Sequence, residues 1–270
     1  MVAVKIGWLE DRYNRTVGGA EISQRAFLDA APDWAEVVYM PARLRPTFEV
    51  DAYIVHNSVG YGREWIEYLE RAPVIRHIHD LWPWGDCVIR RWLLDNSRAL
   101  FFNSPKQLEL FGFSYSVPRV EFIPLPVNIQ HYKDIARFSL KRSGTCWISR
   151  IDPGKGIYYV LDWAVKNNER VDFYGFGEPA MVSMIQSPGR YMGPLDHSDV
   201  PRTLARYERF ICMPTSPDLY GRVMIEAWAA GCDLVTRGDL RAFFDYFSPE
   251  KCQDAGRIFW ETVEAVLAES

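Results

Sequence analysis

The sequence predicts an α/β protein with two doubly wound parallel-sheet domains that face each other across a cleft. Short apolar runs recur along the chain, and most of them are separated by stretches of helix length. The series of runs starts again after a polar, loop-like segment near the middle of the chain. Strands that alternate with helices of about 10 to 15 residues favour right-handed βαβ units and therefore parallel sheets.

Eleven apolar runs are the expected strands, six in the first half and five in the second. The first six are Val4 to Trp8, Val37 to Met40, Ala52 to Val55, Val74 to Ile78, Ala99 to Phe102 and Val120 to Ile123. The other five are Thr145 to Ser149, Val171 to Gly175, Tyr191 to Gly193, Phe210 to Met213 and Asp233 to Thr236. We therefore expect Rossmann-like domains at 1–125 and 144–255, a linker at 126–143, and an amphipathic C-terminal helix at 256–270 that packs back on the first domain.

The bulk composition is that of an ordinary globular protein. The 270 residues are 48% hydrophobic and carry a formal net charge of -4, which gives no overall attraction to nucleic acid. No apolar run approaches the roughly 20 residues of a membrane span. The five cysteines are widely spaced and form no CxxC pair, so we expect buried, reduced thiols and a cytoplasmic protein.

The segment from Asp218 to Gly231 is the strongest candidate for a binding site, because it is typical of a strand end, a short loop and the start of a helix. Asp218 is expected in the loop at the carboxyl end of a parallel strand, where open α/β sheets bind ligands, and Glu226 in the helix. The backbone N–H groups at the helix N-terminus, which suit a phosphate group, belong to Gly221, Arg222 and Val223. Two acids that flank an anion site indicate a phosphorylated sugar.

A second candidate anion site follows the first strand of the second domain. Arg150 and Lys155 lie five positions apart across a Pro-Gly turn, which can fold both cations onto one anion. A guanidinium fork and a compact ammonium group together could neutralise a diphosphate leaving group as it gains charge. The alternative is a solvated turn with two surface cations.

The first domain has a glycine pair, Gly18-Gly19, between its first strand and a helix pattern. Such a pair lets the backbone approach a ligand closely, although a flexible turn is the alternative interpretation. The segment is not the GxGxxG fingerprint of dinucleotide-binding proteins. A nicotinamide or flavin cofactor therefore has no support here.

Two histidines lie at the end of the run that begins at Val74. His77 and His79 are two positions apart and point to the same side of a strand, and His79 is nearer the carboxyl end. His79 could contact a sugar at its reacting carbon, or serve a structural role. A metal held by His77, His79 and Asp80 is a further alternative, but no distant Cys or His cluster completes the set of ligands, so no metal is predicted.

Two strands of the second domain end in glycine, at Gly175 and Gly193. Backbone groups in such loops can touch a nucleobase, and Gly193 with Pro194 is the candidate for this contact. Glycine also simply terminates strands, which is the alternative for each position.

Taken together, these segments resemble the retaining glycosyltransferases of the GT-B fold, family 4 type, over nearly the whole chain. The resemblance rests on the order and spacing of the segments Gly18 to Glu21, His79 to Pro83, Phe102 to Ser104, Phe122 to Pro124, Arg150 with Lys155-Gly156, Gly175 to Gly177, and Asp218 to Gly231. The family has a pair of glutamates with seven residues between them. Here Glu226 is the second of the pair, and Asp218 replaces the first.

The resemblance implies a role for each candidate in binding the donor. Arg150 and Lys155 would hold its diphosphate, and Gly18 and Gly19 would close over the phosphates from the other domain. Glu226 would accept hydrogen bonds from the ribose hydroxyls.

The resemblance also implies the groups nearest the reaction. His79 would act near the reacting carbon, and Asp218 would grip hydroxyls of the transferred sugar, although its side chain is one methylene shorter than the family's glutamate. Gly193 and Pro194 would border the base. No metal ion or other cofactor is implied.

The implied activity is transfer of a hexose, with retention, from a nucleoside-diphosphate sugar to a glycan, lipid-linked or small-molecule acceptor. Two alternatives stay open, namely a nucleotide-sugar-binding module with little or no turnover and a nucleotide-sugar epimerase of the same build. The residues that also fit peripheral membrane contact are Trp82, Trp84, Arg90, Arg91 and Trp92.

Overall fold

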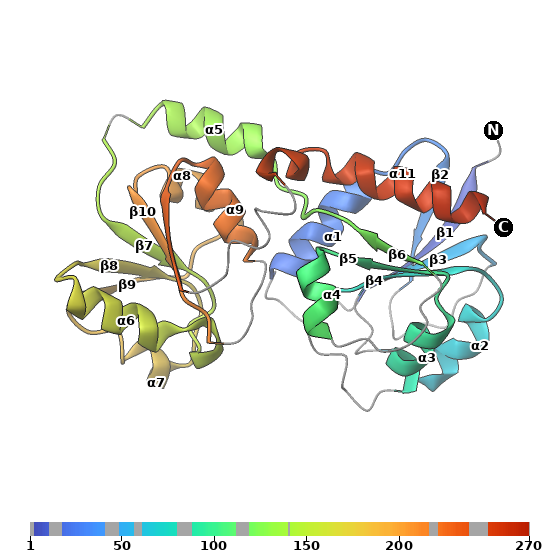
Figure 1. Ribbon diagram of the computed structural model, residues 1–270, viewed down its shortest axis with the longest axis horizontal. Coiled ribbons are helices and arrows are strands. Elements are labelled where there is room, and N and C mark those ends of the chain that lie inside the picture. Colours follow the sequence, from blue (N-terminus) through green and yellow to red (C-terminus); the bar gives the residue numbers. More distant parts are fainter. Residues whose placement is uncertain are drawn as a thin grey trace. The chain divides into compact units, whose positions relative to one another are not determined.

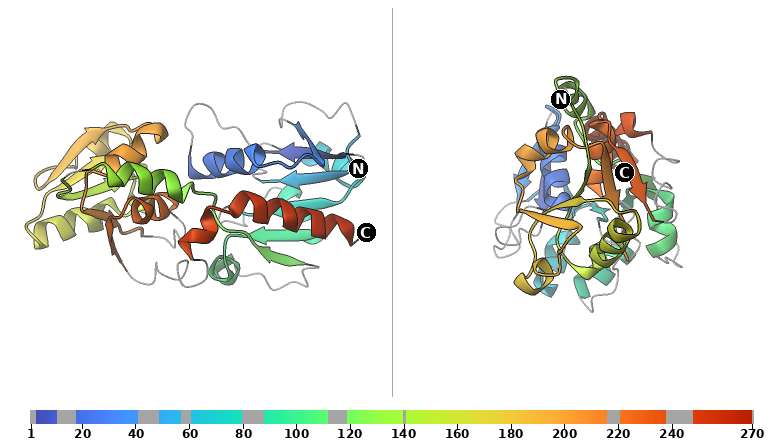
Figure 2. Two further views of the ribbon diagram at one scale, coloured as in Figure 1. Left: turned by 90° about the horizontal axis from the view of Figure 1, so that it is seen from above. Right: turned by 90° about the vertical axis from the view of Figure 1, so that its left-hand side faces the viewer.

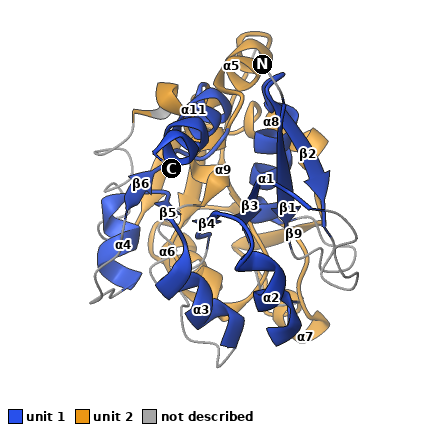
Figure 3. Cartoon of the chain, turned by 90° about the vertical axis from the view of Figure 1, so that its right-hand side faces the viewer, with its two compact units in different colours: residues 1–126, 254–270 blue, residues 127–253 orange. Residues whose placement is uncertain are grey.

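The computed structural model describes residues 3–10, 18–40, 49–56, 61–79, 88–111, 119–139, 141–215, 221–237 and 248–269. The chain forms two compact units, residues 1–126 with 254–270 and residues 127–253 (Figures 1 and 3). Each unit contains one parallel sheet with helices packed on it. This arrangement confirms the predicted α/β fold class with two parallel sheets.

The sheet of the first unit has six strands in the order β2-β1-β3-β4-β5-β6. Their bounds are β1 Val4–Leu9, β2 Ala35–Tyr39, β3 Ala52–Val55, β4 Val74–His77, β5 Ala99–Phe102 and β6 Val120–Phe122. All residues of β3, β4 and β5 are buried, since helices cover both faces of the sheet. The direction in which successive strands are added to the sheet reverses between β1 and β3. The loops that follow β1 and β3 therefore begin next to each other.

Helices α1 (Gly19–Asp29) and α11 (Ala255–Ala268) lie side by side on one face of this sheet (Figures 1 and 2). The rings of Phe27 and Phe259 stack 4.5 Å apart, and the Trp260 indole N–H donates to the Phe27 carbonyl oxygen at 2.8 Å. The C-terminal segment from Asp254 therefore completes the core of the first unit. The remaining helical segments of this unit are η1 Arg63–Trp65, α2 Ile66–Leu69, α3 Val88–Asn96 and α4 Pro105–Phe111.

The sheet of the second unit has five strands in the order β11-β10-β7-β8-β9. Their bounds are β7 Thr145–Ile148, β8 Val171–Tyr174, β9 Gly189–Gly193, β10 Arg209–Cys212 and β11 Asp233–Thr236. The helical segments are α5 Ile129–Arg137, η2 Pro153–Lys155, α6 Ile157–Lys166, α7 Pro179–Val182, η3 His197–Asp199, α8 Val200–Leu204, α9 Arg222–Ala229 and η4 Pro249–Cys252.

The segment 126–143, expected as a linker, contains a helix of the second unit. Helix α5 packs against α8 and α9, and its buried Ile129 and Tyr132 supply the apolar side that this packing needs. Polar residues on the exposed face of α5 gave this segment its loop-like composition. Amphipathic helices on a protein surface carry such a mixture, which single residues do not reveal.

Among the described residues, no helix is both long and apolar enough to cross a membrane. Cys146, Cys212, Cys232 and Cys252 are free thiols, and three of the four are buried.

Candidate functional site

The second sheet reverses its winding between β7 and β10, which are neighbours in the sheet. In open parallel sheets, ligands bind outside the carboxyl ends of the strands at such a reversal. The loop after β7 carries Arg150 and Lys155, and the loop after β10 leads to Gly221 and helix α9. The two predicted anion-binding segments of this unit therefore lie on neighbouring loops.

Backbone contacts fix the turn after β7 against the end of β10. The Thr215 N–H donates to the Gly154 carbonyl oxygen at 3.1 Å, and the Thr215 hydroxyl lies 3.2 Å from that same oxygen. Gly156 has a φ of 80°, and a Cβ built there would lie 1.6 Å from the carbonyl oxygen of Met213. Only glycine fits, because the backbone conformation and the close approach both exclude a side chain.

Asp152 organises the turn that carries the two cations. Its Oδ1 accepts a hydrogen bond from the backbone N–H of Lys155 at 3.0 Å, which caps η2. Its Oδ2 accepts a hydrogen bond from Nε of Arg150. The Arg150 side chain is 73% exposed, so its terminal nitrogens reach solvent and are accessible to an anion.

Glu226 is the most buried charged residue of this site, with 2% of its side chain exposed. Its Oε1 accepts a hydrogen bond from Nε of Arg222 at 2.8 Å and lies 3.1 Å from Nε2 of His197. Burial opposes ionisation of the Glu226 carboxyl, but the contact with His197 and the charge of Arg222 outweigh it and lower its pKa. The carboxylate is therefore ionised at neutral pH, although it is buried.

Tyr132 of helix α5 is the third polar group near Glu226. Burial raises the pKa of its phenol, and the negative charge of Glu226 raises it further. The expected linker segment thus contributes a neutral tyrosine to the surroundings of the predicted ribose-binding carboxylate.

Two of these groups, the side chains of Arg222 and His197, were not predicted from the sequence. The sequence predicted a role for the backbone N–H of Arg222 but none for its side chain. The spacing of four residues between Arg222 and Glu226 on a helix is nevertheless a known signal for an ion pair. His197 lies in the segment after β9 and gave no signal, because its partner is 29 positions away.

Gly193 and Pro194 lie at the carboxyl end of β9, the edge strand of the second sheet. The Gly193 carbonyl oxygen accepts the N–H of Gly175 at 3.0 Å, which joins the two glycine-terminated strand ends. Gly193 has a φ of 99°, and a Cβ built there would meet no described atom within 4 Å. Both predicted base-bordering residues therefore lie at the carboxyl end of an edge strand. Asp218, the residue predicted to contact the transferred sugar, lies outside the described residues.

In the first unit, Gly18 and Gly19 form the N-terminus of helix α1, with Gly18 as the N-cap. The Gly18 N–H donates to Oε2 of Glu21 at 3.0 Å. Gly18 and Gly19 were predicted to close over the donor phosphates. The carboxylate of Glu21 occupies the amide of Gly18, so a phosphate that binds this amide must displace it.

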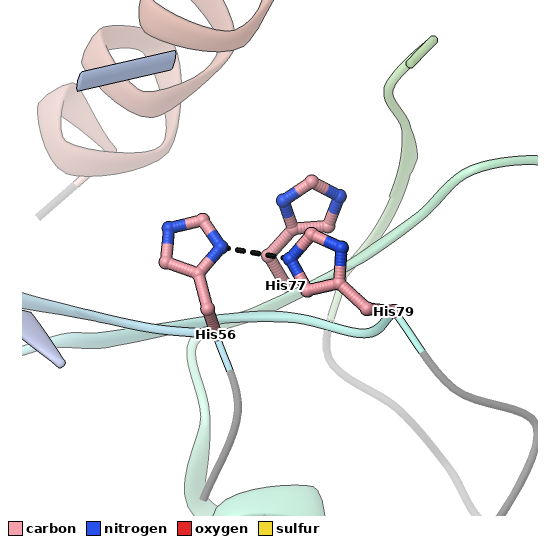
Figure 4. A group of neighbouring side chains, drawn as sticks. All are labelled: His56, His77 and His79. Carbon is pink, nitrogen blue, oxygen red and sulfur yellow. Dashed lines mark hydrogen bonds between the residues drawn. The ribbon is translucent and has the colours of Figure 1, made fainter. Parts of the chain in front are cut away.

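His79 belongs to a cluster with His56 and His77 at the carboxyl ends of β3 and β4 (Figure 4). Nδ1 of His56 lies 2.9 Å from Nε2 of His79, and the rings of His77 and His79 are 4.3 Å apart. Nε2 of His77 lies 3.3 Å from Oδ1 of Asn103. We call His56, His77 and His79 the histidine cluster.

The histidine cluster is neutral at pH 7. Burial lowers the pKa of His77 from 6.5 to about 4, against the hydrogen bond to Asn103. Burial also places the pKa of His56 and of His79 well below 6.5, and the neighbouring imidazoles lower both values further. The sequence did not single out His56. Like His79, however, it follows an apolar run, Ala52 to Val55.

Solved structures share this architecture over the whole chain. HepE of Anabaena in complex with UDP and glucose matches with a TM-score of 0.68 and 14% identity, covering 99% of this chain and 100% of that one. AviGT4, a glycosyltransferase involved in avilamycin A biosynthesis, has a TM-score of 0.62 and 15% identity, with 99% of each chain covered. A glycosyltransferase from Rickettsia africae ESF-5 has a TM-score of 0.62 and 11% identity, covering 99% of this chain and 96% of that one.

No family model matches the chain, and no curated protein matches it. Sequence identities of 11% to 15% to these structures show that the fold is shared. With two parallel-sheet α/β units and these structural neighbours, the chain has the fold of the GT-B glycosyltransferases.

Proposed function

We propose that the chain is a glycosyltransferase that moves a hexose, with retention, from a nucleoside-diphosphate sugar to a glycan, lipid-linked or small-molecule acceptor. The observation that carries this proposal is the pair of neighbouring loops in the second unit. One loop presents Arg150 and Lys155, and the other leads into the N-terminus of α9. A diphosphate suits two cations beside a helix N-terminus in charge and in shape.

The structural neighbours support the donor class. HepE has been solved with UDP and with UDP-glucose, and it shares this fold at 14% and 17% identity. We therefore place UDP and UDP-glucose first among the donors to be tested.

In the proposed donor complex, Arg150 and Lys155 neutralise the charge that develops on the leaving diphosphate, without a divalent cation. The amides of Gly221, Arg222 and Val223 complete this anion site. Both described contacts of Glu226 with His197 and Arg222 end on Oε1, so Oε2 is the oxygen that we assign to the ribose hydroxyls. Gly193 and Pro194 border the base.

For the transferred sugar, we assign contacts to His79 and Asp218, and for the phosphates a further contribution from Gly18 and Gly19. The acceptor attacks from the face that the diphosphate leaves, and a phosphate oxygen of the leaving group takes the acceptor proton. This route explains why the proposal needs no nucleophile from the protein.

Thermal-shift measurements with nucleoside diphosphates and their sugars test this function, followed by an assay of donor hydrolysis and transfer. A ligand at 100 times its dissociation constant should stabilise the protein by about 2.7 kcal/mol. The Arg150→Ala variant should lose this shift. Lys166→Ala is the matched control, because its side chain is 70% exposed and pairs with Asp162 on the same helix.

Each alternative has its own outcome in these assays. Binding without hydrolysis or transfer indicates a nucleotide-sugar-binding module. Conversion of the sugar without an acceptor indicates an epimerase. If no nucleoside diphosphate or nucleotide-sugar shifts the unfolding temperature, the proposed function is wrong.

We further infer that the protein acts in the cytoplasm, and contact with a membrane surface stays a prediction. Trp82 and Trp84 lie outside the described residues. Trp92 of helix α3 packs against the apolar core of the first unit, so it is not a fully exposed membrane anchor. Partition of the protein onto anionic vesicles measures this contact directly.

A further inference from the structure

We propose that the histidine cluster is a binding site for a divalent transition metal, with Zn²⁺ as the preferred ion. His56 directly follows β3, His77 ends β4, and His79 lies two positions further along (Figure 4). One nitrogen from each ring lies within 4.8 Å of the others. Three imidazole ligands that leave a fourth position open form a set that Zn²⁺ takes in proteins.

The spacing of the rings is close to that of a zinc site. Tetrahedral Zn²⁺ with bonds of about 2.0 Å separates its ligand atoms by roughly 3.4 Å. The facing nitrogens of His56 and His79 are 2.9 Å apart, and the largest separation in the cluster is below 4.8 Å. Small torsions of the side chains, which move ring atoms by about 1 Å, bring the three nitrogens to this spacing.

The pair of His56 and His79 now shares one proton between its facing nitrogens, because one neutral ring must donate and the other accept. A metal that takes the place of this proton needs both lone pairs. The donating ring then changes tautomer and carries its proton on its other nitrogen. No net proton has to leave the site.

Asn103 fixes the tautomer of the third ring. Its Oδ1 can only accept a hydrogen bond, so Nε2 of His77 carries the proton and Nδ1 carries a lone pair. The backbone N–H of Asn103 donates to Oε1 of Gln107 at 2.7 Å, which holds this residue in place. Metal-binding histidines typically have such a partner on the nitrogen that faces away from the metal.

Two nitrogens of the cluster are buried without a hydrogen-bond partner among the described residues, namely Nδ1 of His77 and Nε2 of His56. A buried polar atom without a partner costs free energy, and a bound ion or water is a common explanation. Zn²⁺ satisfies Nδ1 of His77 directly. The sequence predicted no metal because a distant ligand was missing, and His56, 23 positions before His79, is that ligand.

A charged side chain near the cluster affects its affinity for a cation. The positive charge of Arg76 on β4 acts on His79 and opposes a dication. Loss of this charge in Arg76→Gln should therefore tighten metal binding, which a purely structural role of the cluster would not produce.

The test uses the full chain after removal of metals with a chelator. Titration calorimetry with ZnCl₂ at pH 7 should show one site per chain, and CoCl₂ should give the visible absorption bands of tetrahedral Co²⁺. His79→Gln and His77→Gln should weaken binding at least 100-fold. Asn103→Ala should weaken it by about 10-fold to 100-fold. His131→Ala, which removes an exposed histidine of helix α5, should leave it unchanged.

Circular dichroism of each variant separates loss of the metal site from loss of the fold. The Co²⁺ spectrum of the parental protein tests the site without any substitution. The proposal is overturned if the parental chain binds no stoichiometric Zn²⁺. It is also overturned if a folded His79→Gln variant keeps the parental affinity and Co²⁺ spectrum. His79 is also assigned to the transferred sugar, but neither outcome is read from glycosyl transfer, so failure of the metal site and failure of the proposed function are distinguishable.

Discussion

The two units place their candidate residues at equivalent positions, beyond the carboxyl ends of parallel strands, but surround them differently. In the second unit the groups are charged and paired, with Glu226 on Arg222 and Arg150 on Asp152. In the first unit the histidine cluster is neutral and packs on aromatic rings, among them Trp8 at 4.2 Å from His56. The same architecture thus offers charge in one unit and neutral lone pairs in the other.

Burial explains this difference. A carboxylate can stay ionised when buried only if a cation and hydrogen bonds replace its water, as Arg222 and His197 do for Glu226. A buried imidazole becomes neutral by losing its proton, which requires little free energy at neutral pH because the usual pKa lies near 6.5. A neutral cluster therefore suits metal ions or uncharged sugars, whereas paired charges suit a nucleoside diphosphate.

The largest effect is expected when the buried ion pair is broken. Glu226→Ala removes a buried carboxylate that pairs with Arg222, whose side chain is 11% exposed, and should lower the free energy of unfolding by roughly 4 kcal/mol. Glu261→Ala is the matched control, since Arg257 and Glu261 have the same spacing but side chains 60% and 59% exposed. That variant should lose about 0.5 kcal/mol or less. Urea unfolding followed by tryptophan fluorescence measures both, and equal losses would contradict the special burial of Glu226.

The same pair has a defined pH dependence. Because the folded-state pKa of Glu226 is lowered, its contribution is present above the usual carboxyl pKa of about 4.3 and is lost as the pH falls through the folded value. The difference in stability between the parental chain and Glu226→Gln should therefore shrink below about pH 4.3.

The next effect concerns the cations of the second unit. Arg150→Ala or Lys155→Ala should reduce kcat/KM for transfer at least about 100-fold, or roughly 3 kcal/mol, because each removes a preorganised charge from the leaving diphosphate. Steady-state assays with UDP-glucose and related donors check this, with Lys166→Ala as the control of equal charge. Parental rates in both variants would break the assignment of this loop.

A fourth prediction concerns the buried histidines of the first unit. His77 has a folded-state pKa of about 4 against its usual 6.5, so the unfolded chain binds more protons between these values. The free energy of unfolding should fall as the pH drops from 6.5 to 4, by about 3 kcal/mol from this residue alone. Denaturation at several pH values in a chelating buffer measures the slope. His77→Gln should reduce it, whereas His131→Ala should not, and a flat profile for the parental chain would contradict the buried neutral state.

The smallest effect tests the junction of β7 and β10. Gly156→Ala and Gly144→Ala both place a side chain at a positive φ, 80° and 74°. Among the described residues, only the first side chain meets a neighbour, the Met213 carbonyl oxygen. Strain should cost about 1 kcal/mol in each, and the clash should add about 2 kcal/mol at Gly156. Thermal unfolding of the two variants isolates this contact, and equal melting temperatures would show that the junction yields easily.

Much of the fold could be predicted from the sequence. The observed strands begin and end within two residues of the apolar runs. For β3 and β5 the reason is that every residue of these strands is buried, so they are apolar along their length. Helix α11 lies at 255–268, close to the expected 256–270, since its apolar stripe repeats with the helical period. Helix α5 was missed because its sequence is polar on the exposed side.

The sequence by itself determined which strand ends carry the candidate residues, since Arg150 and His79 directly follow apolar runs and Lys155 lies in the same loop as Arg150. Only the tertiary structure decided the partners: His56 for His79 and His197 for Glu226, at separations of 23 and 29 positions. The physical reason is that the order of strands in a sheet brings distant loops together. A local pattern of residues fixes each strand, but not its neighbours.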